Sequence, residues 1–252
     1  MLPLVDCYQN STTMYLVTDL GGSDLFEFLF ENSKGVPETW ARSICYHLIR
    51  ATNYLHTLKY AHRDIKPENI LIIFNKESGE VEDLKLCDFG LAAFCDETPL
   101  TEFCGSPGFY SPEMACLGGY NGYINDSWSI GCVLLELILG SNVFNDLWLS
   151  VYDYINDKER ASIFKTELEK ICKLLPAILL REASQEFVDL MMGFLTIDPL
   201  SRKLISDLSD FSFLSKFPPL FHSKSPTFSS SDSTASVTST LSVVEPYFPS
   251  TF

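Results

Sequence analysis

The segment AHRDIKPENILI, residues 61–72, says most about the fold of this sequence. Between His62 and Asn69 it holds two permanent cations, two carboxylates and an amide, with Pro67 fixing the backbone among them. A charge run of this kind is usually a solvated surface loop. Its flanks are apolar, however, because NYLHTLKY precedes it and ILII follows it. A polar loop between buried segments is more often a site, and we interpret it so.

The composition predicts a globular protein with an acidic surface. The chain has 252 residues, of which 46% are hydrophobic and 13% aromatic, enough for a sizeable core in one or two domains. Its formal net charge of −15 argues against nucleic acid as a main partner, because phosphate contacts need a basic surface. The same charge favours basic proteins or peptides through long-range attraction.

The cysteines and the apolar runs predict the cellular compartment of the protein and whether it spans a membrane. The 8 cysteines are scattered without a CxxC pair, so neither a zinc site nor a redox dithiol is indicated. No secretory leader is evident, so we expect reduced thiols in an intracellular, most simply cytoplasmic, protein. The longest apolar run, IGCVLLELILG at 130–140, contains Glu136 and is too short to span a bilayer. We predict a buried core helix there and no membrane partner.

The N-terminal part of the chain predicts strands, one helix and a hairpin. LPLVDCY and TMYLVTDL form two strands around the turn-prone QNST. A helix is predicted from Pro37, at its first helical position, to about His56. After the polar loop, ILIIF and DLKLC form a hairpin around the polar turn NKESGEVE.

The rest of the chain predicts a long loop, several helices and a polar tail. Residues 91–113 show little periodicity and contain Gly, Pro, Ser and Thr, which is typical of a functional loop. Beyond His222 a Ser/Thr-rich segment has little to bury and is predicted to be disordered. Helical patterns occupy 127–139, 146–156, 163–180, 184–195 and 203–210.

Four polar side chains in the loop and after the hairpin suit one chemistry. Asn69 and Asp88 supply hard oxygen ligands of the kind that Mg²⁺ prefers, few enough to leave room for water and phosphate. Asp64 can accept a proton from a hydroxyl nucleophile, and Lys66 can neutralise charge on a transferred group. We expect Gly90 to let the backbone turn beyond the metal ligand. Together these groups are what phosphoryl transfer requires.

The motifs that hold these residues resemble those of the eukaryotic protein kinase family. HRDIKPEN at 62–69 resembles the catalytic loop of that family, and DFG at 88–90 resembles its metal-binding segment. GSPGFYSPE at 105–113 resembles the end of the activation segment, with Ser-Pro-Glu where the family often has Ala-Pro-Glu. DSWSIG at 126–131 resembles the start of the buried central helix, and DPLSR at 198–202 the late arginine segment.

The resemblance covers about residues 1–217 and implies an α+β, protein kinase-like fold. Its mainly α-helical large lobe would carry the catalytic-loop hairpin, beside two remnant strands of the small-lobe sheet. Residues 1–20 would be the remnant of the small lobe and hinge, 21–217 the large lobe, and 218–252 a disordered tail. The family's glycine-rich phosphate cover, strand lysine and helix glutamate do not precede residue 15. We therefore expect an incomplete kinase domain whose two remnant strands expose an open edge.

The resemblance implies a role for each residue of the catalytic machinery. Asp64 would orient the substrate hydroxyl and accept its proton, and Lys66 would contact the γ-phosphate. A lysine at this place resembles the serine/threonine-specific branch. Asn69 and Asp88 would hold Mg²⁺.

The resemblance also implies a set of ATP-binding residues. Thr18 resembles the gatekeeper behind the adenine, and the backbone groups of Asp19 and Gly21 would bond the adenine edge. Asp24 resembles the acidic residue near the ribose, and Leu71 the adenine floor. Thr18 and Leu71 are also compatible with ordinary strand positions, and Asp24 with a helix cap.

In the activation segment the resemblance implies control by negative charge. Arg63 marks the subclass whose activation segment is usually ordered by a phosphate. Counting back from Ser106, the usual phosphorylated position falls on Glu102. Our hypothesis is that Glu102 pairs with Arg63 and replaces part of the phosphate, the alternative being a solvated acidic loop. Thr101 and Thr98 are candidate phosphorylation sites.

The function implied by the resemblance is transfer of the γ-phosphoryl group of ATP to protein serine or threonine hydroxyls. Glu113 and Arg202 would form a buried salt bridge in the large lobe. Glu68 and Asp24 lie where basophilic kinases of the calcium/calmodulin-dependent type read arginines, so basic substrates are expected. The alternative is a non-catalytic, pseudokinase-like interaction module without the nucleotide roof. A small-molecule kinase is a third option, opposed by the peptide-docking platform that GSPGFYSPE resembles.

Overall fold

A computed structural model describes residues 1–116, 118–156 and 160–210 of the chain. The tail predicted to be disordered, 218–252, lies outside the described residues, as do the last residues of the predicted large lobe. Among the residues described, no helix combines the length and apolarity needed to cross a membrane.

Strands β1 (Leu4–Gln9) and β2 (Met14–Thr18) form an antiparallel pair of their own. The turn between them is closed by Asn10, whose side-chain oxygen accepts the backbone N–H groups of Thr12 and Thr13 at 2.9 and 2.8 Å. Every residue of both strands is exposed, including apolar ones such as Leu4 and Leu16. The predicted pair of strands is thus present, and it covers no core of its own.

The hairpin after the polar loop consists of β5 (Ile70–Asn75) and β6 (Glu80–Leu86). Strand β3 (Ser23–Asp24) pairs with the other side of β5, so the sheet order is β3-β5-β6. The loop is shorter than predicted, because the side-chain oxygen of Asn75 accepts the N–H groups of Glu77 and Ser78. Gly79, at φ 73°, then returns the chain to β6 in the left-handed region that glycine tolerates.

Seven α-helices are the main regular elements in the part of the chain that the structure describes. The short strands β4 (Tyr60–Ala61) and β7 (Ala93–Phe94) pair beside the polar loop, and 3-10 turns occupy Pro67–Asn69, Leu149–Asn156 and Ile205–Asp210. The helices are α1 (Leu25–Glu31), α2 (Glu38–Thr57), α3 (Pro112–Cys116), α4 (Gly122–Leu139), α5 (Ser141–Leu147), α6 (Arg160–Leu179) and α7 (Gln185–Phe194).

Several predicted helix boundaries were wrong, each for a local reason. α4 begins at 122, not 127, because the side-chain oxygen of Asn121 accepts the N–H groups of Tyr123 and Ile124 and caps the helix. Pro37 is the N-cap of α2 and not its first helical residue. The patterns at 146–156 and 203–210 are mainly 3-10 turns, whose apolar spacing cannot be told from that of an α-helix.

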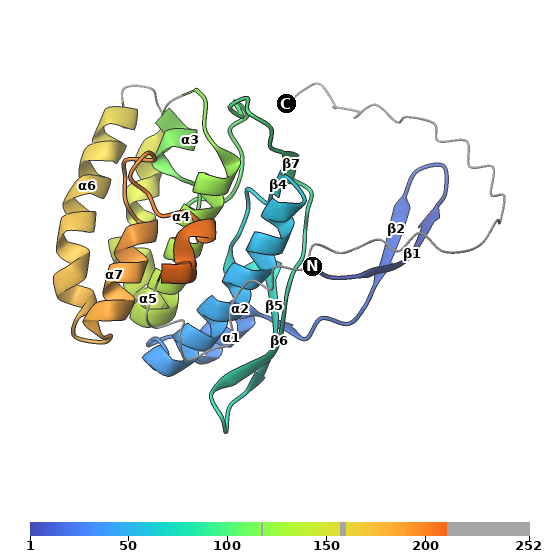
Figure 1. The fold of residues 1–252 in the computed structure, drawn as a ribbon, viewed down its shortest axis with the longest axis horizontal. Helices are drawn as coiled ribbons and strands as arrows, with labels where there is room; N and C mark the ends of the chain where they lie inside the picture. Colours follow the sequence, from blue (N-terminus) through green and yellow to red (C-terminus); the bar gives the residue numbers. More distant parts are fainter. Residues whose placement is uncertain (117, 157–159, 211–252) are drawn as a thin grey trace. The chain divides into compact units, whose positions relative to one another are not determined.

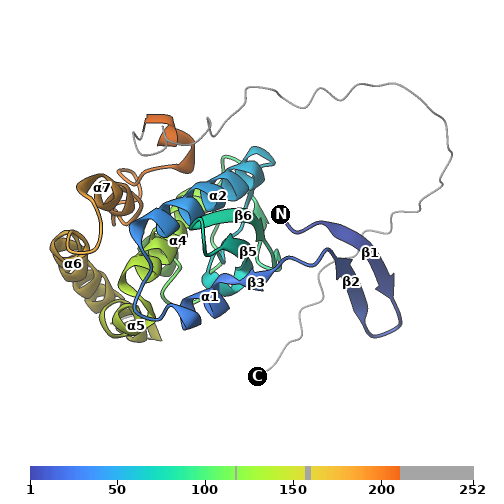
Figure 2. The same ribbon diagram turned by 90° about the horizontal axis from the view of Figure 1, so that it is seen from below.

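Helix α4 is the centre of the core, with α2 and α7 packed against it (Figure 1). Nearly every residue of α4 is buried, as predicted for the apolar run at 130–140. Trp128 of α4 lies 5.7 Å from Trp148, ring centre to ring centre, and both side chains are fully buried. Figure 2 shows the other face of α2, which lies along β6 and so joins the helical body to the hairpin. The polar loop before β5 is therefore fixed between the sheet and the core.

Candidate active site

Asp126, at the N-terminal end of the buried helix α4, anchors the polar loop. Its Oδ1 accepts the N–H of Arg63 at 2.9 Å, and its Oδ2 accepts the N–H of His62 at 2.8 Å. His56 of α2 bonds the same Oδ2 through Nε2 at 2.8 Å. Arg63 has φ 67°, which is strained for a residue with a side chain, and these bonds hold it there. Sequence reasoning missed this role, although an acid at the start of an apolar helix was a visible signal.

His62 is buried, and its Nε2 lies 3.0 Å from the carbonyl oxygen of Cys87. Its ring also packs at 5.1 Å from the ring of Phe89. The histidine thus joins the polar loop to the segment that contains Asp88. It serves as a structural histidine.

The two predicted catalytic side chains lie together, and a hydroxyl is held between them. Lys66 Nζ lies 3.3 Å from Asp64 Oδ2. The Oγ of Ser106 accepts a hydrogen bond from Lys66 Nζ at 2.7 Å and donates one to Asp64 Oδ1 at 2.8 Å. Asp64 is buried, with only 8% of its surface exposed. From the sequence, Ser106 was predicted to belong to the activation segment, but this contact was not predicted, because it joins residues far apart in the chain.

The predicted magnesium ligands are brought to adjoining positions. The side-chain nitrogen of Asn69 donates to the backbone O and to Oδ2 of Asp64 at 2.9 and 3.1 Å, which leaves its side-chain oxygen to face a cation. The N–H of Cys87 donates to the carbonyl of Asn69 at 3.0 Å, which sets Asp88 next to it. An amide oxygen and a carboxylate suit Mg²⁺, which keeps several waters and phosphate oxygens, so the donor set fits.

The turn at the DFG segment differs from the prediction in one respect. The residue in the left-handed region is Asp88 itself, at φ 57°, and not Gly90. The Oδ1 of Asp88 accepts the N–H of Gly90 at 3.2 Å, and a Cβ at Gly90 would lie 3.1 Å from that oxygen. The glycine therefore leaves space for the carboxylate.

Three of the five predicted ATP-binding residues gather at the β3–β5 edge. Asp24 pairs with Leu71 in the sheet, and a Cβ on Gly21 would lie 2.2 Å from Leu71 Cδ1, so Gly21 packs closely against the Leu71 side chain, which would have to move to admit a larger residue. Thr18 is exposed at the end of β2. This strand pairs with β1 and belongs to a different sheet from β3 and β5, so sheet pairing does not bring Thr18 to the other three residues. The N–H of Asp19 donates to the carbonyl of Pro3 at 3.3 Å. The backbone group of Asp19 that could bond an adenine edge would therefore be its carbonyl oxygen.

Asp24 also has the second role that the sequence allowed. Its Oδ1 accepts the N–H of Glu27 at 2.7 Å and caps α1. This bond stabilises the first turn of the helix. The cap leaves Asp24 half-buried at the end of β3, beside Leu71.

The predicted ion pair between Arg63 and Glu102 is present. Arg63 Nη2 donates to Glu102 Oε2 at 2.9 Å, while Nη1 donates to the hydroxyl of Tyr120 at 3.1 Å. The Tyr120 hydroxyl in turn donates to the backbone carbonyl of Glu102 at 2.9 Å. At Gly105, φ 91°, a Cβ would meet the carbonyl of Arg63 at 2.8 Å, so the activation segment lies directly on the polar loop. Thr101 is exposed beside Glu102.

Glu113 and Arg202 form the predicted buried salt bridge. Arg202 Nη1 and Nη2 donate to the two carboxylate oxygens of Glu113 at 2.5 and 2.8 Å, with both side chains nearly fully buried. The Arg202 guanidinium also lies 4.8 Å from the ring centre of Trp128 and donates through Nε to the carbonyl of Thr196. This pair ties the end of the activation segment to α4 and to the loop after α7.

The polar loop, the DFG segment and residues 102–106 therefore meet at one place. Residues 1–214 match the family model described as a protein kinase domain, which is most of the chain. The chain belongs to the protein kinase family. Its mixed α+β structure, with a mainly helical body and small antiparallel sheets, is consistent with that fold.

Comparison with curated proteins gives serine/threonine kinases as relatives. The chain is 33% identical over 230 residues to the serine/threonine-protein kinase GIN4 of Saccharomyces cerevisiae, covering 89% of this chain and 18% of that protein. It is 32% identical over 202 residues to the mitogen-activated protein kinase mpkC of Emericella nidulans, covering 74% and 46%. It is 29% identical over 219 residues to the human SNF-related serine/threonine-protein kinase, covering 86% and 26%. The chain thus spans less than half the length of each of these relatives.

Proposed function

We propose that this protein transfers the γ-phosphoryl group of ATP to serine or threonine hydroxyls of other proteins, with residues 21–217 as the large lobe of the kinase. The observation that carries the proposal is the hydroxyl of Ser106, held between the carboxylate of Asp64 and the ammonium of Lys66. A substrate hydroxyl needs the same two partners, an acceptor for its proton and a cation beside the transferred group. We also propose that the protein acts inside the cell, most simply in the cytoplasm, where ATP is available.

Each side chain of the cluster has a defined part in the proposed reaction. Asp64 orients the attacking hydroxyl and accepts its proton, and the amide of Asn69 holds that carboxylate in place. Lys66 reduces the negative charge that builds up on the transferred phosphoryl group. Mg²⁺ bound by the side-chain oxygens of Asn69 and Asp88 would neutralise charge on the nucleotide phosphates. Gly21, Asp24 and Leu71 support the nucleoside end, with Asp19 contributing its backbone carbonyl.

Replacement of Asp64 by asparagine tests the proposed base. Asparagine keeps the size of the side chain and can still accept hydrogen bonds, but it cannot take a proton. We expect phosphotransfer from ATP to a protein substrate, measured on the full-length gene product with Mg²⁺, to fall by at least about 100-fold. Thermal unfolding of the variant serves as the control for folding. Equal turnover by both proteins would rule out Asp64 as the base, and no transfer by the unchanged protein would favour the non-catalytic module.

We further propose that the substrates carry basic residues near the target hydroxyl. Glu136 is buried in α4, where desolvation raises its pKa to about 7; the hydroxyl of Ser141 opposes this shift and the charge of Glu68 adds to it. Two carboxyl groups near each other repel, and an arginine or lysine between them would remove that repulsion. Glu68 is exposed on the catalytic loop, next to the proposed Mg²⁺ ligand Asn69. The two groups therefore support recognition of a substrate cation.

Matched peptides test this preference. We expect a peptide with arginines before its target serine to have a lower KM than one with alanines at those places, and Glu68→Gln to reduce that difference about 3- to 10-fold. The kcat on the alanine peptide should stay unchanged, because Glu68 does not contact the Asp64 carboxylate in the described hydrogen bonds. A Glu68→Gln protein with the full arginine preference would contradict the assignment.

A further inference from the structure

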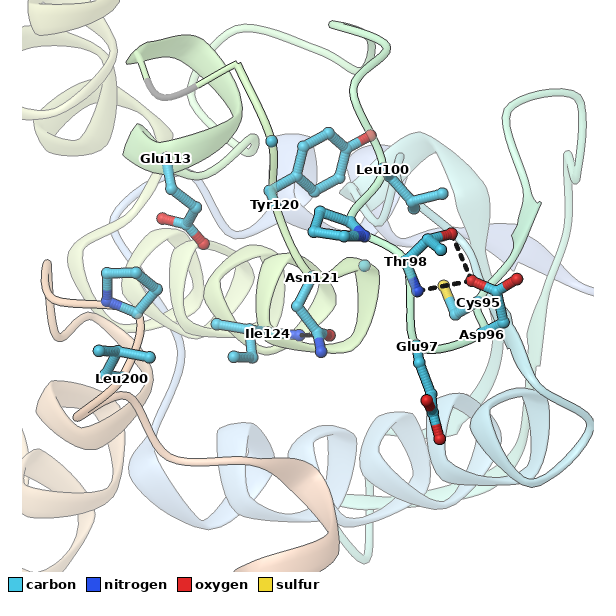
Figure 3. Close-up of a pocket in the computed structure, with 14 residues that line it drawn as sticks. Cys95, Asp96, Glu97, Thr98, Leu100, Glu113, Tyr120, Asn121, Ile124 and Leu200 are labelled. Atoms are coloured by element: carbon cyan, nitrogen blue, oxygen red, sulfur yellow. Dashed lines mark hydrogen bonds between the residues drawn. The ribbon is translucent and has the colours of Figure 1, made fainter.

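A pocket of about 230 Å³ lies away from the catalytic cluster, between the start of the activation segment and the loop after α7 (Figure 3). One wall is the segment from Cys95 to Leu100, the floor is the start of α4, and the opposite wall is Pro199 and Leu200. None of the proposed catalytic residues or magnesium ligands lines it. The pocket is therefore a separate feature of the molecule.

The walls of the pocket are mostly apolar and are held in place by the backbone. Leu100 and Tyr120 exchange two backbone hydrogen bonds of 2.9 and 2.8 Å, which fix the activation segment against the loop before α4. Pro99 and Pro199 add stiff backbone on the two sides. Leu200 is 92% exposed at the edge of the pocket. An isolated exposed leucine is ordinary, but one that lines an apolar hollow offers a contact surface.

The charge around this pocket is negative. Asp96 and Glu97 belong to its wall and are exposed, and among the described lining residues there is no lysine or arginine. The hydroxyl and the N–H of Thr98 donate to Asp96 Oδ1, and these bonds lower the pKa of Asp96, so it is ionised at neutral pH. The carboxylate of Glu113, the other acid of the lining, is neutralised by Arg202. The whole chain carries a net charge of −15.

A second pocket, of about 600 Å³, adjoins the first. The two share Glu113, Pro199 and Leu200. Its lining adds Glu169 and Asp198 against a single cation, Lys165, so acids again exceed bases. The two hollows together form an apolar groove with an acidic border, and Leu200 lines both of its halves.

We propose that this groove docks a peptide segment of another protein that carries a large apolar residue flanked by lysine or arginine. The first hollow is smaller than the roughly 300–1,000 Å³ of typical small-molecule sites, and it suits one apolar side chain. Flanking cations would meet Asp96 and Glu97 on one side, and Glu169 and Asp198 on the other. The proposal rests on shape and charge and does not depend on phosphotransfer.

Binding of short labelled peptides to the full chain tests the docking groove. The probe is a fluorescein-labelled peptide with a central leucine between arginines, followed by anisotropy in the absence of nucleotide. Peptides with serine in place of leucine, or glutamates in place of arginines, are the comparisons. We expect both to bind at least about 10-fold more weakly than the probe, and added salt to weaken the probe.

Two sets of variants locate the site. Leu200→Ser should weaken probe binding by at least about 10-fold, and because Leu200 is exposed this change leaves the fold intact. Asp96→Asn with Glu97→Gln should weaken binding and flatten its salt dependence. Glu77→Gln with Glu182→Gln removes the same charge at two exposed positions outside the pocket linings and should leave binding nearly unchanged.

The proposal fails on any of four results. The first is that the Leu200→Ser protein binds the probe as tightly as the unchanged protein. The second is that Asp96→Asn with Glu97→Gln weakens probe binding no more than Glu77→Gln with Glu182→Gln does. The third is hydrogen exchange in which the probe protects none of the segments that line the groove, which are 95–100, 119–124 and 197–200. If the chain self-associates, and Leu200→Ser abolishes that association while the probe does not bind, the groove holds a second copy and our proposal is wrong.

Discussion

Arg63 connects three parts of the molecule through one side chain. Its guanidinium donates to the carbonyl of Leu91 at 2.6 Å, to the hydroxyl of Tyr120 and to the carboxylate of Glu102. Only 6% of the residue is exposed, so these bonds replace the water that a buried cation loses. Because Asp64 follows Arg63 directly, any change in this set of bonds reaches the proposed base.

Replacement of Glu102 by alanine tests whether its carboxylate orders the activation segment. The side chain of Glu102 is 59% exposed, so solvent screening limits the pair to about 1 kcal/mol or less. We therefore expect a loss of phosphotransfer of about 5-fold at most and faster hydrogen exchange across 100–105. Glu77→Ala, an exposed acid in the β5–β6 turn, is the control. Unchanged activity and exchange would mean that Glu102 is simply a solvated acid.

Single residues also mark the limit of what the sequence reveals. The spacing from Ser106 predicted the partner of Arg63, because that distance is local and set by a motif. The bonds of Asp126 to the loop and of Ser106 to Asp64 and Lys66 were not predicted. They join residues distant in the sequence, and only folding brings such groups together.

At the scale of elements, Arg202 joins α3, α4 and the loop after α7 around one buried charge pair. A buried pair adds little net stability, but losing one partner leaves an uncompensated charge in the core. We expect Arg202→Met to lower the free energy of unfolding by about 3–5 kcal/mol, measured with urea. The double variant with Glu113→Leu should recover a large part of that loss, since neither buried charge then remains. If the double variant recovered none of the lost free energy of unfolding, the contacts of the Arg202 side chain with the helices, and not its charge, would account for its contribution to stability.

Element boundaries were harder to predict than the elements themselves. The apolar pattern from 146 onward predicted one helix, but α5 ends at Leu147 and a 3-10 turn follows. Trp148 lies at this break, fully buried, and its indole N–H donates to the carbonyl of Gly108 at 2.9 Å. A tertiary contact thus outweighs local propensity, and no pattern within the segment carries that information.

At the scale of the whole molecule, stability should depend on pH through Glu136. Burial raises the pKa of its carboxyl from 4.5 to about 7, so the protonated form is favoured in the folded state. Its contribution to stability is fully present below pH 4.5 and is lost as the pH rises through 7. We expect Glu136→Gln to gain stability relative to the unchanged protein between these limits, by up to about 3 kcal/mol.

Urea unfolding at a series of pH values measures this effect. The difference between the two proteins should grow from pH 4.5 to pH 8, and the exposed-site variant Glu182→Gln should show no such trend. Parallel pH profiles for Glu136→Gln and the unchanged protein would show that Glu136 remains ionised in the fold. The glutamine can still accept the hydrogen bond from Ser141, so that bond does not confound the comparison.

The general architecture was predictable because several kinds of signal agreed. The hairpin after the polar loop, the buried helix at 130–140 and the presence of the first two strands all follow from the alternation or continuity of apolar residues. The family followed from motifs in a fixed order. How α2, α4 and α7 pack could not be derived in this way, since packing depends on side-chain shapes that periodicity ignores.

The carboxylate of Glu102 has a consequence for how such a protein is regulated. A phosphate on a kinase is added by one enzyme and removed by another, so the cell can reverse it within minutes. The Glu102 carboxylate that pairs with Arg63 is encoded in the sequence and is present from synthesis onward. No phosphatase can remove it, so if Glu102 orders the activation segment as hypothesised, that contribution would be constant, and control would fall to other sites such as Thr98 and Thr101, to protein abundance or to binding partners.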